Sequence, residues 1–146
     1  MPDILHRVGI TAPREAVFRA LTAPGELAAW WTADTYSPDD SDILMFRFGE
    51  VGGFDMKVLE TSAPGTVRWE VIDGPSEWIG TTVSFALTQD DDWTIVLFEH
   101  AGWLEPVEFM HHCSTKWAVF LMSLKSLIET GTGAPHPRDV QISNWH

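Results

Sequence analysis

His100 is the side chain in this sequence with the most evident chemical potential. It stands in the stretch Phe-Glu-His-Ala-Gly (98–102), near the end of an expected strand, and alternation places it on the apolar face. A histidine among apolar side chains stays neutral near pH 7, because desolvation disfavours its charged form. Such a ring can orient a ligand oxygen or move a proton. His100 is therefore a candidate catalytic residue. The alternative is a core histidine that is hydrogen-bonded to backbone, so the sequence leaves enzymatic activity open.

The run His111-His112-Cys113 has metal-ligating residue types without metal-ligating spacing. Adjacent helix positions point about 100° apart, whereas residues four apart share a face and can converge on one ion. The acidic runs at 39–42 and 90–92 lack the alternating spacing of a calcium loop. Cys113 is the only cysteine, so it forms no internal disulfide. We therefore expect no metal and no cofactor.

The sequence carries no familiar nucleophile or phosphate motif. It has no Gly-x-Ser-x-Gly elbow, and the stretch 49–53 lacks the Lys and the Ser or Thr of a phosphate-binding loop. Glu60, Glu70 and Glu99 fall mostly on the expected outward face, so no buried acid–base pair is indicated. The chain therefore shows no complete catalytic apparatus.

Eight tryptophans and eight phenylalanines are the compositional surprise in a chain of 146 residues. Each aromatic ring buries about 150–250 Å², so these side chains must either pack very tightly or surround a space. We expect a ligand-sized apolar cavity, with His100, Thr81 and Arg47 as the polar groups inside it. The expected lining is Trp31, Phe46, Phe54, Met56, Trp69, Thr81, Phe85, Phe98, His100, Trp117, Phe120, Leu121 and Leu124. The alternative is a filled core.

The charge balance excludes several classes of partner. The net charge is −12 and only nine Lys and Arg residues are present, so nucleic acid and anionic membrane surfaces are not expected partners. No apolar run approaches the roughly 18 residues that cross a bilayer, and the first residues do not resemble a signal peptide. We expect one cytoplasmic domain over residues 1–146, with a core at about 3–131 and a tail at 132–146.

Turn signals divide the chain into the elements that would position these side chains. A strand over 3–10 precedes two short helices, the second over 26–31, and a polar segment over 32–42 follows. Short turns then separate five strands of an antiparallel meander: 43–48, 54–61, 66–72, 78–88 and 93–103. A helix from about 107 to 130 stops at Gly131, a natural C-cap. The predicted fold class is α+β, a curved antiparallel sheet of about six strands wrapped around the long C-terminal helix.

The last strand of the meander carries large apolar residues on the side that should face water. This outer set is Trp93, Ile95, Leu97 and Trp103. Contiguous exposed patches often mark interfaces. We expect either a homodimer through this face or a tail that folds over it. The apolar residues of the tail are Val140, Ile142 and Trp145. A register slip of one residue would exchange the two faces and move His100 outside.

Three stretches and the final helix resemble the START-like (SRPBCC) superfamily. The stretches are Thr-Ala-Pro-Arg-Glu-Ala-Val-Phe-Arg-Ala-Leu-Thr (11–22), Leu-Ala-Ala-Trp-Trp (27–31) and Phe-Glu-His-Ala-Gly-Trp (98–103). Within the superfamily the chain is most similar to the branch of the activator of the heat-shock chaperone ATPase, which includes polyketide-cyclase-like proteins. The resemblance covers about residues 3–131. It implies the helix-grip fold.

This resemblance also implies a class of function. The superfamily includes lipid and sterol carriers, aromatase/cyclase enzymes, resistance proteins and chaperone regulators, and a fold alone does not choose among them. We expect binding of an apolar small molecule, lipid-, polyketide- or aromatic-like, between sheet and helix. The alternatives are a chaperone ATPase regulator and a protein-interaction domain with a filled core. Known eukaryotic regulators pair such a domain with another, for which this chain has no room.

Overall fold

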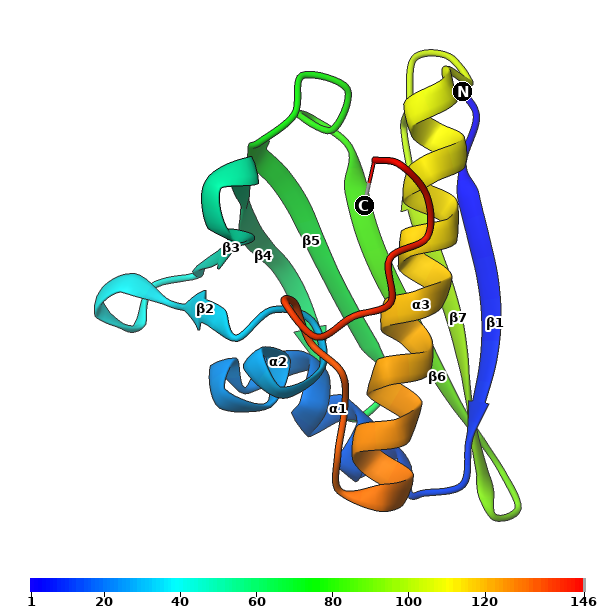
Figure 1. The fold of residues 1–146 in the computed structure, drawn as a ribbon. Coiled ribbons are helices and arrows are strands. Elements are labelled where there is room, and N and C mark those ends of the chain that lie inside the picture. Colours follow the sequence, from blue (N-terminus) through cyan, green and yellow to red (C-terminus); the bar gives the residue numbers. More distant parts are fainter. Residues whose placement is uncertain (146) are drawn as a thin grey trace.

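The computed structural model describes residues 1–145, apart from the side chains of Asp40 and Val51; His146, the last residue of the expected domain, lies outside the described residues. The helices are α1 (Arg14–Thr22), α2 (Pro24–Trp30) and α3 (Glu108–Thr130), with short 3-10 turns at Pro38–Asp40 and Gly49–Val51. The strands are β1 (Ile4–Ile10), β2 (Asp34–Tyr36), β3 (Ile43–Arg47), β4 (Gly53–Ser62), β5 (Thr66–Asp73), β6 (Thr82–Asp90) and β7 (Trp93–Ala101). The predicted α+β class is confirmed (Figure 1).

The strands form one antiparallel sheet in the order β1-β7-β6-β5-β4-β3-β2. Seven strands are present rather than about six, because β2 pairs with β3 through Thr35 and Phe46. This extra strand has three residues and lies inside a polar segment. Such a strand is too short to show a readable alternation. The sheet otherwise follows the expected meander, with the first strand returning to pair with the last.

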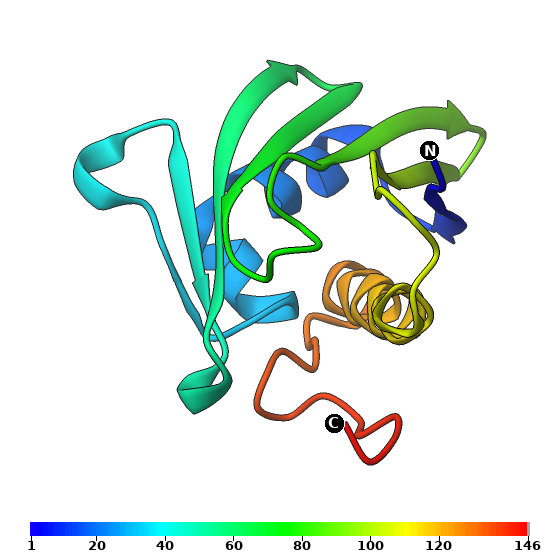
Figure 2. The same cartoon turned by 90° about the horizontal axis from the view of Figure 1, so that it is seen from above.

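Helix α3 lies in the concave side of the sheet, which curves around it when seen from above (Figure 2). It begins at Glu108 and ends at Gly131, whose φ of 87° gives the left-handed C-cap expected of a glycine. Its buried face includes Trp117, Leu121 and Leu124, which pack toward the sheet. No helix within residues 1–145 combines the length and apolar content that a bilayer crossing requires.

Helices α1 and α2 close one end of the curve. Helix α2 begins at Pro24 rather than near residue 26, because the fixed φ of proline suits the first position of a helix. The two helices are joined by a buried hydrogen bond from Trp30 Nε1 to the carbonyl oxygen of Ala20 at 2.8 Å. This contact fixes the position of Trp31, the next residue in the chain and a wall of the site described below.

The alternation in the central strands places the apolar residues on the concave face as expected. In β7, Val96, Phe98 and His100 are buried, while Leu97 between them is 51% exposed. In β5, Val67 and Trp69 are buried in the same way. The register is therefore not slipped, and His100 points inward.

The expected outer patch is wrong at one of its members. Trp103 is 1% exposed, although strict alternation with Trp93 would leave it on the outer face. The strand ends at Ala101, and Gly102 has a φ of 92°, a left-handed conformation that turns the chain and sends the next side chain inward. The outer apolar patch, defined here as Leu5, Trp93, Ile95 and Leu97, lies on the strands β1 and β7, where Ile95 is half-buried and the other three are exposed.

The tail also lies elsewhere than expected. It does not fold over the outer patch but runs back along α3 on the opposite side of the molecule (Figure 1, orange to red). Thr32 pairs with His136 in an isolated parallel bridge, and the Trp145 ring lies 5.5 Å from the His112 ring. Polar contacts of the tail with residues near α2 and α3 determine this path. A hydrophobic pattern does not reveal such contacts.

Candidate functional site

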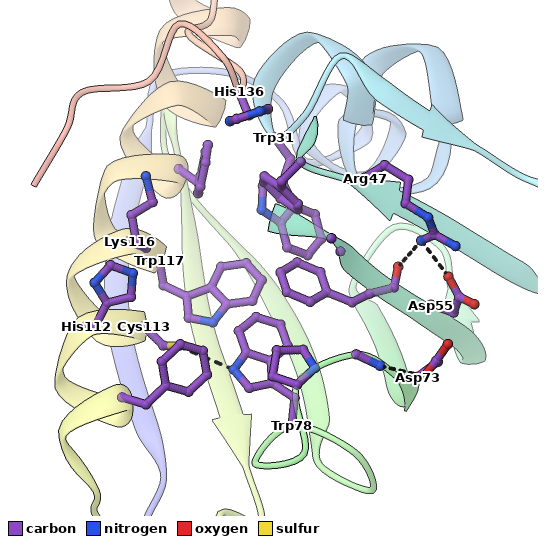
Figure 3. Close-up of a pocket in the computed structure, with 18 of the residues that line it drawn as sticks. Trp31, Arg47, Asp55, Asp73, Trp78, His112, Cys113, Lys116, Trp117 and His136 are labelled. Carbon is purple, nitrogen blue, oxygen red and sulfur yellow. Dashed lines mark hydrogen bonds and ion pairs between the residues drawn. The ribbon is translucent and has the colours of Figure 1, made fainter. Parts of the chain in front are cut away.

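A cavity of about 670 Å³ opens between the N-terminal half of α3 and the nearby edge of the sheet. The connection between β3 and β4, the turn after β5 and the segment after α3 complete its walls (Figure 3). The lining residues are Trp31, Arg47, Phe48, Gly52, Gly53, Phe54, Asp55, Asp73, Gly74, Pro75, Trp78, Phe109, His112, Cys113, Lys116, Trp117, Phe120, His136 and Trp145. Aromatic rings occupy the middle of this set, with Arg47, Asp55 and Asp73 on the sheet side and Lys116 on the helix side (Figure 3).

The aromatic wall consists of three nearly parallel rings, Phe54, Trp78 and Trp117, and of the Trp31 ring, which is tilted by 41° from that of Trp117. Phe54 stacks on Trp78 with centroids 4.1 Å apart and planes 13° apart. Trp78 and Trp117 are 5.9 Å apart with planes at 15°, and Trp31 lies 4.9 Å from Trp117. Because these rings stack on one another, Trp31, Trp78 and Trp117 are almost fully buried, whereas Phe54 is half-buried at the cavity. Figure 3 shows Trp31, Trp78 and Trp117 converging on the space from the end of α2, the turn after β5 and α3.

Two ion pairs hold the cations of the cavity, one on the sheet side and one on the helix side. Arg47 donates to Asp55 Oδ1 at 2.8 Å, and the same guanidinium nitrogen reaches the carbonyl oxygens of Phe46 and Phe54. The hydrogen bond that Arg47 donates to Asp55 raises the pKa of Arg47 above its ordinary value. Lys116 pairs with the buried carboxylate of Asp139. Both cations are therefore oriented by carboxylates at the edge of an apolar space.

His100 is fully buried, and both of its ring nitrogens are hydrogen-bonded. Trp117 Nε1 donates to Nδ1 at 3.1 Å. An indole nitrogen can only donate, so Nδ1 carries no proton and the neutral ring has its proton on Nε2. Nε2 then donates to Thr81 Oγ1 at 2.8 Å, and that hydroxyl donates to the carbonyl oxygen of Trp78 at 2.6 Å. Every donor and acceptor in this chain of bonds is used.

The position of His100 bears directly on the catalytic hypothesis. Burial lowers its pKa to about 3, so the ring is neutral near pH 7, as its apolar surroundings lead one to expect. It does not line the cavity. The geometry is that of a core histidine, although the partners are side chains of Thr81 and Trp117 rather than backbone. A catalytic role would require this chain of hydrogen bonds to open.

The residues of the run 111–113 point in different directions. His111 is exposed, His112 lines the cavity, and Cys113 is buried in its wall. Burial raises the pKa of the Cys113 thiol to about 12, so it is not a reactive thiolate, and its sulfur accepts a hydrogen bond from Trp78 Nε1 at 3.3 Å. Within the described part of the chain, no three His, Cys, Asp or Glu side chains are grouped as metal ligands.

The cavity shares only part of the expected lining. Trp31, Phe54, Trp117 and Phe120 line it, as does the expected polar group Arg47. The remaining expected residues are buried but lie outside the lining: Phe46, Met56, Trp69, Thr81, Phe85, Phe98, His100, Leu121 and Leu124. They fill the centre between sheet and helix, so the open space is confined to one end of it.

Several lining residues were not expected from the sequence. Trp78 was assigned to the start of a strand, but it lies in the turn between β5 and β6 and reaches into the cavity. Phe48 directly follows β3, Phe109 lies in the first turn of α3, and His136 and Trp145 belong to the tail. Periodicity assigns no direction to residues in loops. The high tryptophan count was the one signal that pointed to them.

The chain is similar to a known protein family and to several solved structures. The model of the family described as Activator of Hsp90 ATPase homolog 1-like protein matches residues 11–129. The solution structure of the Aha1 dimer from Colwellia psychrerythraea is similar at 42% identity and a TM-score of 0.83, covering 91% of this chain and 100% of that one. No curated protein matches the sequence at a significant level.

Two further solved structures share the fold at lower identity. DynU16, a putative protein in the dynemicin biosynthetic locus, is 22% identical with a TM-score of 0.74, covering 90% of this chain and 48% of that one. CalU16 from Micromonospora echinospora is 19% identical with a TM-score of 0.69, covering 86% and 73%. At these identities the likeness shows a common fold.

Proposed function

Because the chain belongs to the family of Activator of Hsp90 ATPase homolog 1-like proteins, a branch of the START-like superfamily, we propose that it binds an apolar small molecule in its aromatic cavity. The ligand class is lipid-, polyketide- or aromatic-like. Natural ligand pockets measure about 300–1,000 Å³, are mostly apolar and carry few polar groups. The cavity of about 670 Å³ between α3 and the sheet is the observation that supports this proposal.

The shape of the wall favours a molecule with at least one flat face. The near-parallel rings of Phe54, Trp78 and Trp117 form a flat stack beside the cavity, and the cations Arg47 and Lys116 line it from β3 and from α3. An apolar body would lie against the rings, while a hydroxyl or carbonyl oxygen would meet the cations. No turnover is required for this role.

Native mass spectrometry and tryptophan fluorescence test the binding directly. The purified protein is titrated with palmitic acid, naphthol, anthraquinone and anilinonaphthalene sulfonate. Saturable one-to-one binding with quenching is the expected result, because Trp31, Trp78 and Trp117 line the cavity. Failure of every ligand to bind would favour the interpretation in which the domain acts through its surface.

A cavity-filling variant locates the site. Cys113→Phe adds a ring at the cavity wall and is expected to weaken binding by about tenfold or more, because the ligand must then overpack the remaining space. The matched control is Leu59→Phe, which adds the same ring at a position that is 43% exposed and outside the lining. Equal affinities in the two variants would place the ligand elsewhere on the protein.

A role as a chaperone ATPase regulator is the second candidate. It is favoured by the family match and by the 42% identity with the Aha1 protein over nearly the whole chain. A pull-down with the host chaperone, followed by measurement of its ATPase rate, separates this role from ligand binding. Stimulation that is the same in the wild type and in Cys113→Phe would show that the regulatory surface does not depend on the cavity.

The outer patch supports a homodimer, the assembly found for the Colwellia psychrerythraea relative. Leu5 is 66% exposed, Leu97 51% and Trp93 45%, on the adjacent strands β1 and β7. Arg7 lies opposite Leu97 and Glu99 opposite Leu5 on the same face. In a two-fold interface a residue of one copy meets a different residue of the other. Arg7 and Glu99 would then pair across the contact and flank its apolar centre.

Leu97→Glu is expected to convert the dimer to a monomer, because it places an unpaired charge in the apolar centre of the contact. Sedimentation velocity over a range of concentrations measures the result. The control is Leu104→Glu, a charge at an 85% exposed position in the loop before α3, which should leave the dimer intact. A dimer that survives Leu97→Glu would move the interface to another face.

A further inference from the structure

The segment after α3 forms one wall of the cavity, although it lies beyond the residues that the family model matches. The match ends at residue 129, and the strap, defined here as residues 132–145, follows. Figures 1 and 2 show it running back beside α3, toward the end of the molecule at which the helix begins. His136 and Trp145 from the strap line the cavity. This chain therefore builds part of its site from residues outside the shared domain.

The first part of the strap, residues 132–139, is held firmly. Ala134 N donates to Ser123 Oγ at 2.8 Å on α3. His136 N donates to the carbonyl oxygen of Trp31 at 2.8 Å, and Ala33 N donates to the carbonyl oxygen of His136 at 3.2 Å. These bonds fix the strap to both α3 and the chain that leaves α2. The strap wall at His136 is therefore part of the folded domain.

An ion pair ends this firmly held part. The Asp139 side chain is fully buried and pairs with Lys116, whose side chain is 18% exposed. The second carboxylate oxygen of Asp139 lies 3.6 Å from His136 Nδ1. Lys116 also lies over the Phe120 ring at 5.1 Å, and both residues line the cavity. The Lys116–Asp139 pair thus joins the strap to the helix wall of the site.

The distal part, residues 140–145, is held differently. Val140 is 62% exposed and Trp145 49%. The bonds from Gln141 Nε2 and Trp145 N both end on Ser143, within the same segment. Trp145 contacts the body of the domain through its ring, which lies 5.5 Å from the ring of His112. Few buried contacts and local hydrogen bonds are the features of a segment that opens at low cost.

We propose that residues 140–145 are a gate on the ligand cavity, hinged after Asp139, with Trp145 as the side chain that closes it. The Lys116–Asp139 pair is the latch that holds the hinge in place. In the closed state Trp145 rests on His112 and narrows the mouth of the cavity; in the open state the segment swings away and the mouth widens. This role rests on the proposed binding function, because a gate controls the rate at which a ligand enters and leaves.

Opening can be measured without any ligand, because the chain has a single cysteine and that cysteine lies in the cavity wall. Cys113 is 4% exposed, and burial raises its pKa to about 12, so the closed state protects it from alkylation. The thiolate is the reactive form, so labelling by N-ethylmaleimide at mildly alkaline pH reports the fraction of time that the cavity is open. Mass spectrometry of the intact full-length chain gives the rate.

Two gate variants and two matched controls test the proposal. Trp145→Ala removes the closing ring, and its control is Trp93→Ala, a tryptophan of similar exposure (45%) on the outer face. Asp139→Asn removes the latch charge, and its control is Glu26→Gln, which breaks the ion pair with Arg19 away from the cavity. Both gate variants are expected to speed labelling of Cys113 about tenfold. For Asp139→Asn this is the change that the loss of one charge-assisted contact produces. The controls are expected to label at the wild-type rate.

Stopped-flow binding of anilinonaphthalene sulfonate supplies the second arm. Trp145→Ala is expected to raise both the association and the dissociation rate, since a gate limits passage in both directions. If both gate variants label at the wild-type rate, the gate proposal is wrong, regardless of the kinetics of dye binding. Faster labelling in a protein that binds none of the ligands or the dye would leave the gate standing and would refute the binding function. Thermal unfolding of each variant shows that labelling occurs below its melting transition.

Discussion

Replacing Trp117 with alanine is expected to lower the free energy of unfolding by about 3–5 kcal/mol, the range for loss of a large aromatic side chain from a core. Trp117 is 2% exposed and contacts Phe98 at 4.5 Å and Trp31 at 4.9 Å between ring centroids. It also donates the hydrogen bond to His100 Nδ1, so its removal leaves a buried acceptor unsatisfied. The packing loss and the orphaned nitrogen act in the same direction.

Urea unfolding followed by circular dichroism measures this loss. Trp93→Ala is the control, because it removes the same side chain from a position that is 45% exposed, where about 1 kcal/mol or less is expected. Trp117→Phe separates the two causes, since it keeps most of the ring and removes the donor to His100. Equal losses for Trp117→Ala and Trp93→Ala would mean that the aromatic centre is not the stabilising core.

The second large effect is a dependence of stability on pH that comes from His100. Burial lowers its folded-state pKa from 6.5 to about 3. Between these values the unfolded chain binds a proton that the folded chain does not, so stability falls as the pH falls. Above pH 6.5 neither state binds it and this contribution is constant. From pH 6.5 to about pH 5 the expected loss is about 2 kcal/mol, at 1.36 kcal/mol per pH unit.

The variant His100→Gln isolates that contribution. Glutamine keeps a donor for Thr81 but does not titrate, so its stability should change less over the same interval. The observable is the difference between the two curves of unfolding free energy against pH, measured at constant ionic strength. Glu129, whose pKa is lowered from its ordinary value of 4.5 to about 2, mainly by its hydrogen bond with Lys125, loses its contribution to stability at lower pH, below 4.5. Parallel curves for the wild type and His100→Gln would show that His100 takes up its proton equally in both states.

The strands and the long helix were predictable because their patterns repeat over many residues. The inward face of β7, with Val96, Phe98 and His100, follows from simple alternation, and the end of α3 follows from Gly131. The alternation fails at Gly102, where one positive φ turns Trp103 from the outer face into the core. A hydrophobic period does not encode a single backbone angle, so alternation alone predicts the wrong face for Trp103.

The cavity was harder to predict than the fold, because loops build much of it. The apolar faces of sheet and helix predict which side chains are buried, and Phe85, Phe98 and Leu124 are indeed buried. These faces do not predict where the packed core ends and the cavity begins. That boundary depends on the turn that carries Trp78 and on the strap with Trp145, whose positions arise from long-range contacts with α3. Residue types identified an aromatic centre, while its open end required the three-dimensional structure.

The indole stack at this open end gives the molecule an optical property of its own. The Trp78 ring lies 5.9 Å from the Trp117 ring, and the Trp117 ring lies 4.9 Å from the Trp31 ring. The planes of the first pair are nearly parallel. Transition dipoles at such separations couple, so excitation is shared among the three chromophores rather than confined to one. Their fixed handed arrangement should dominate the near-ultraviolet dichroism, a signal that vanishes when specific packing is lost. A guest molecule against any one of these rings would perturb the coupled spectrum of them all.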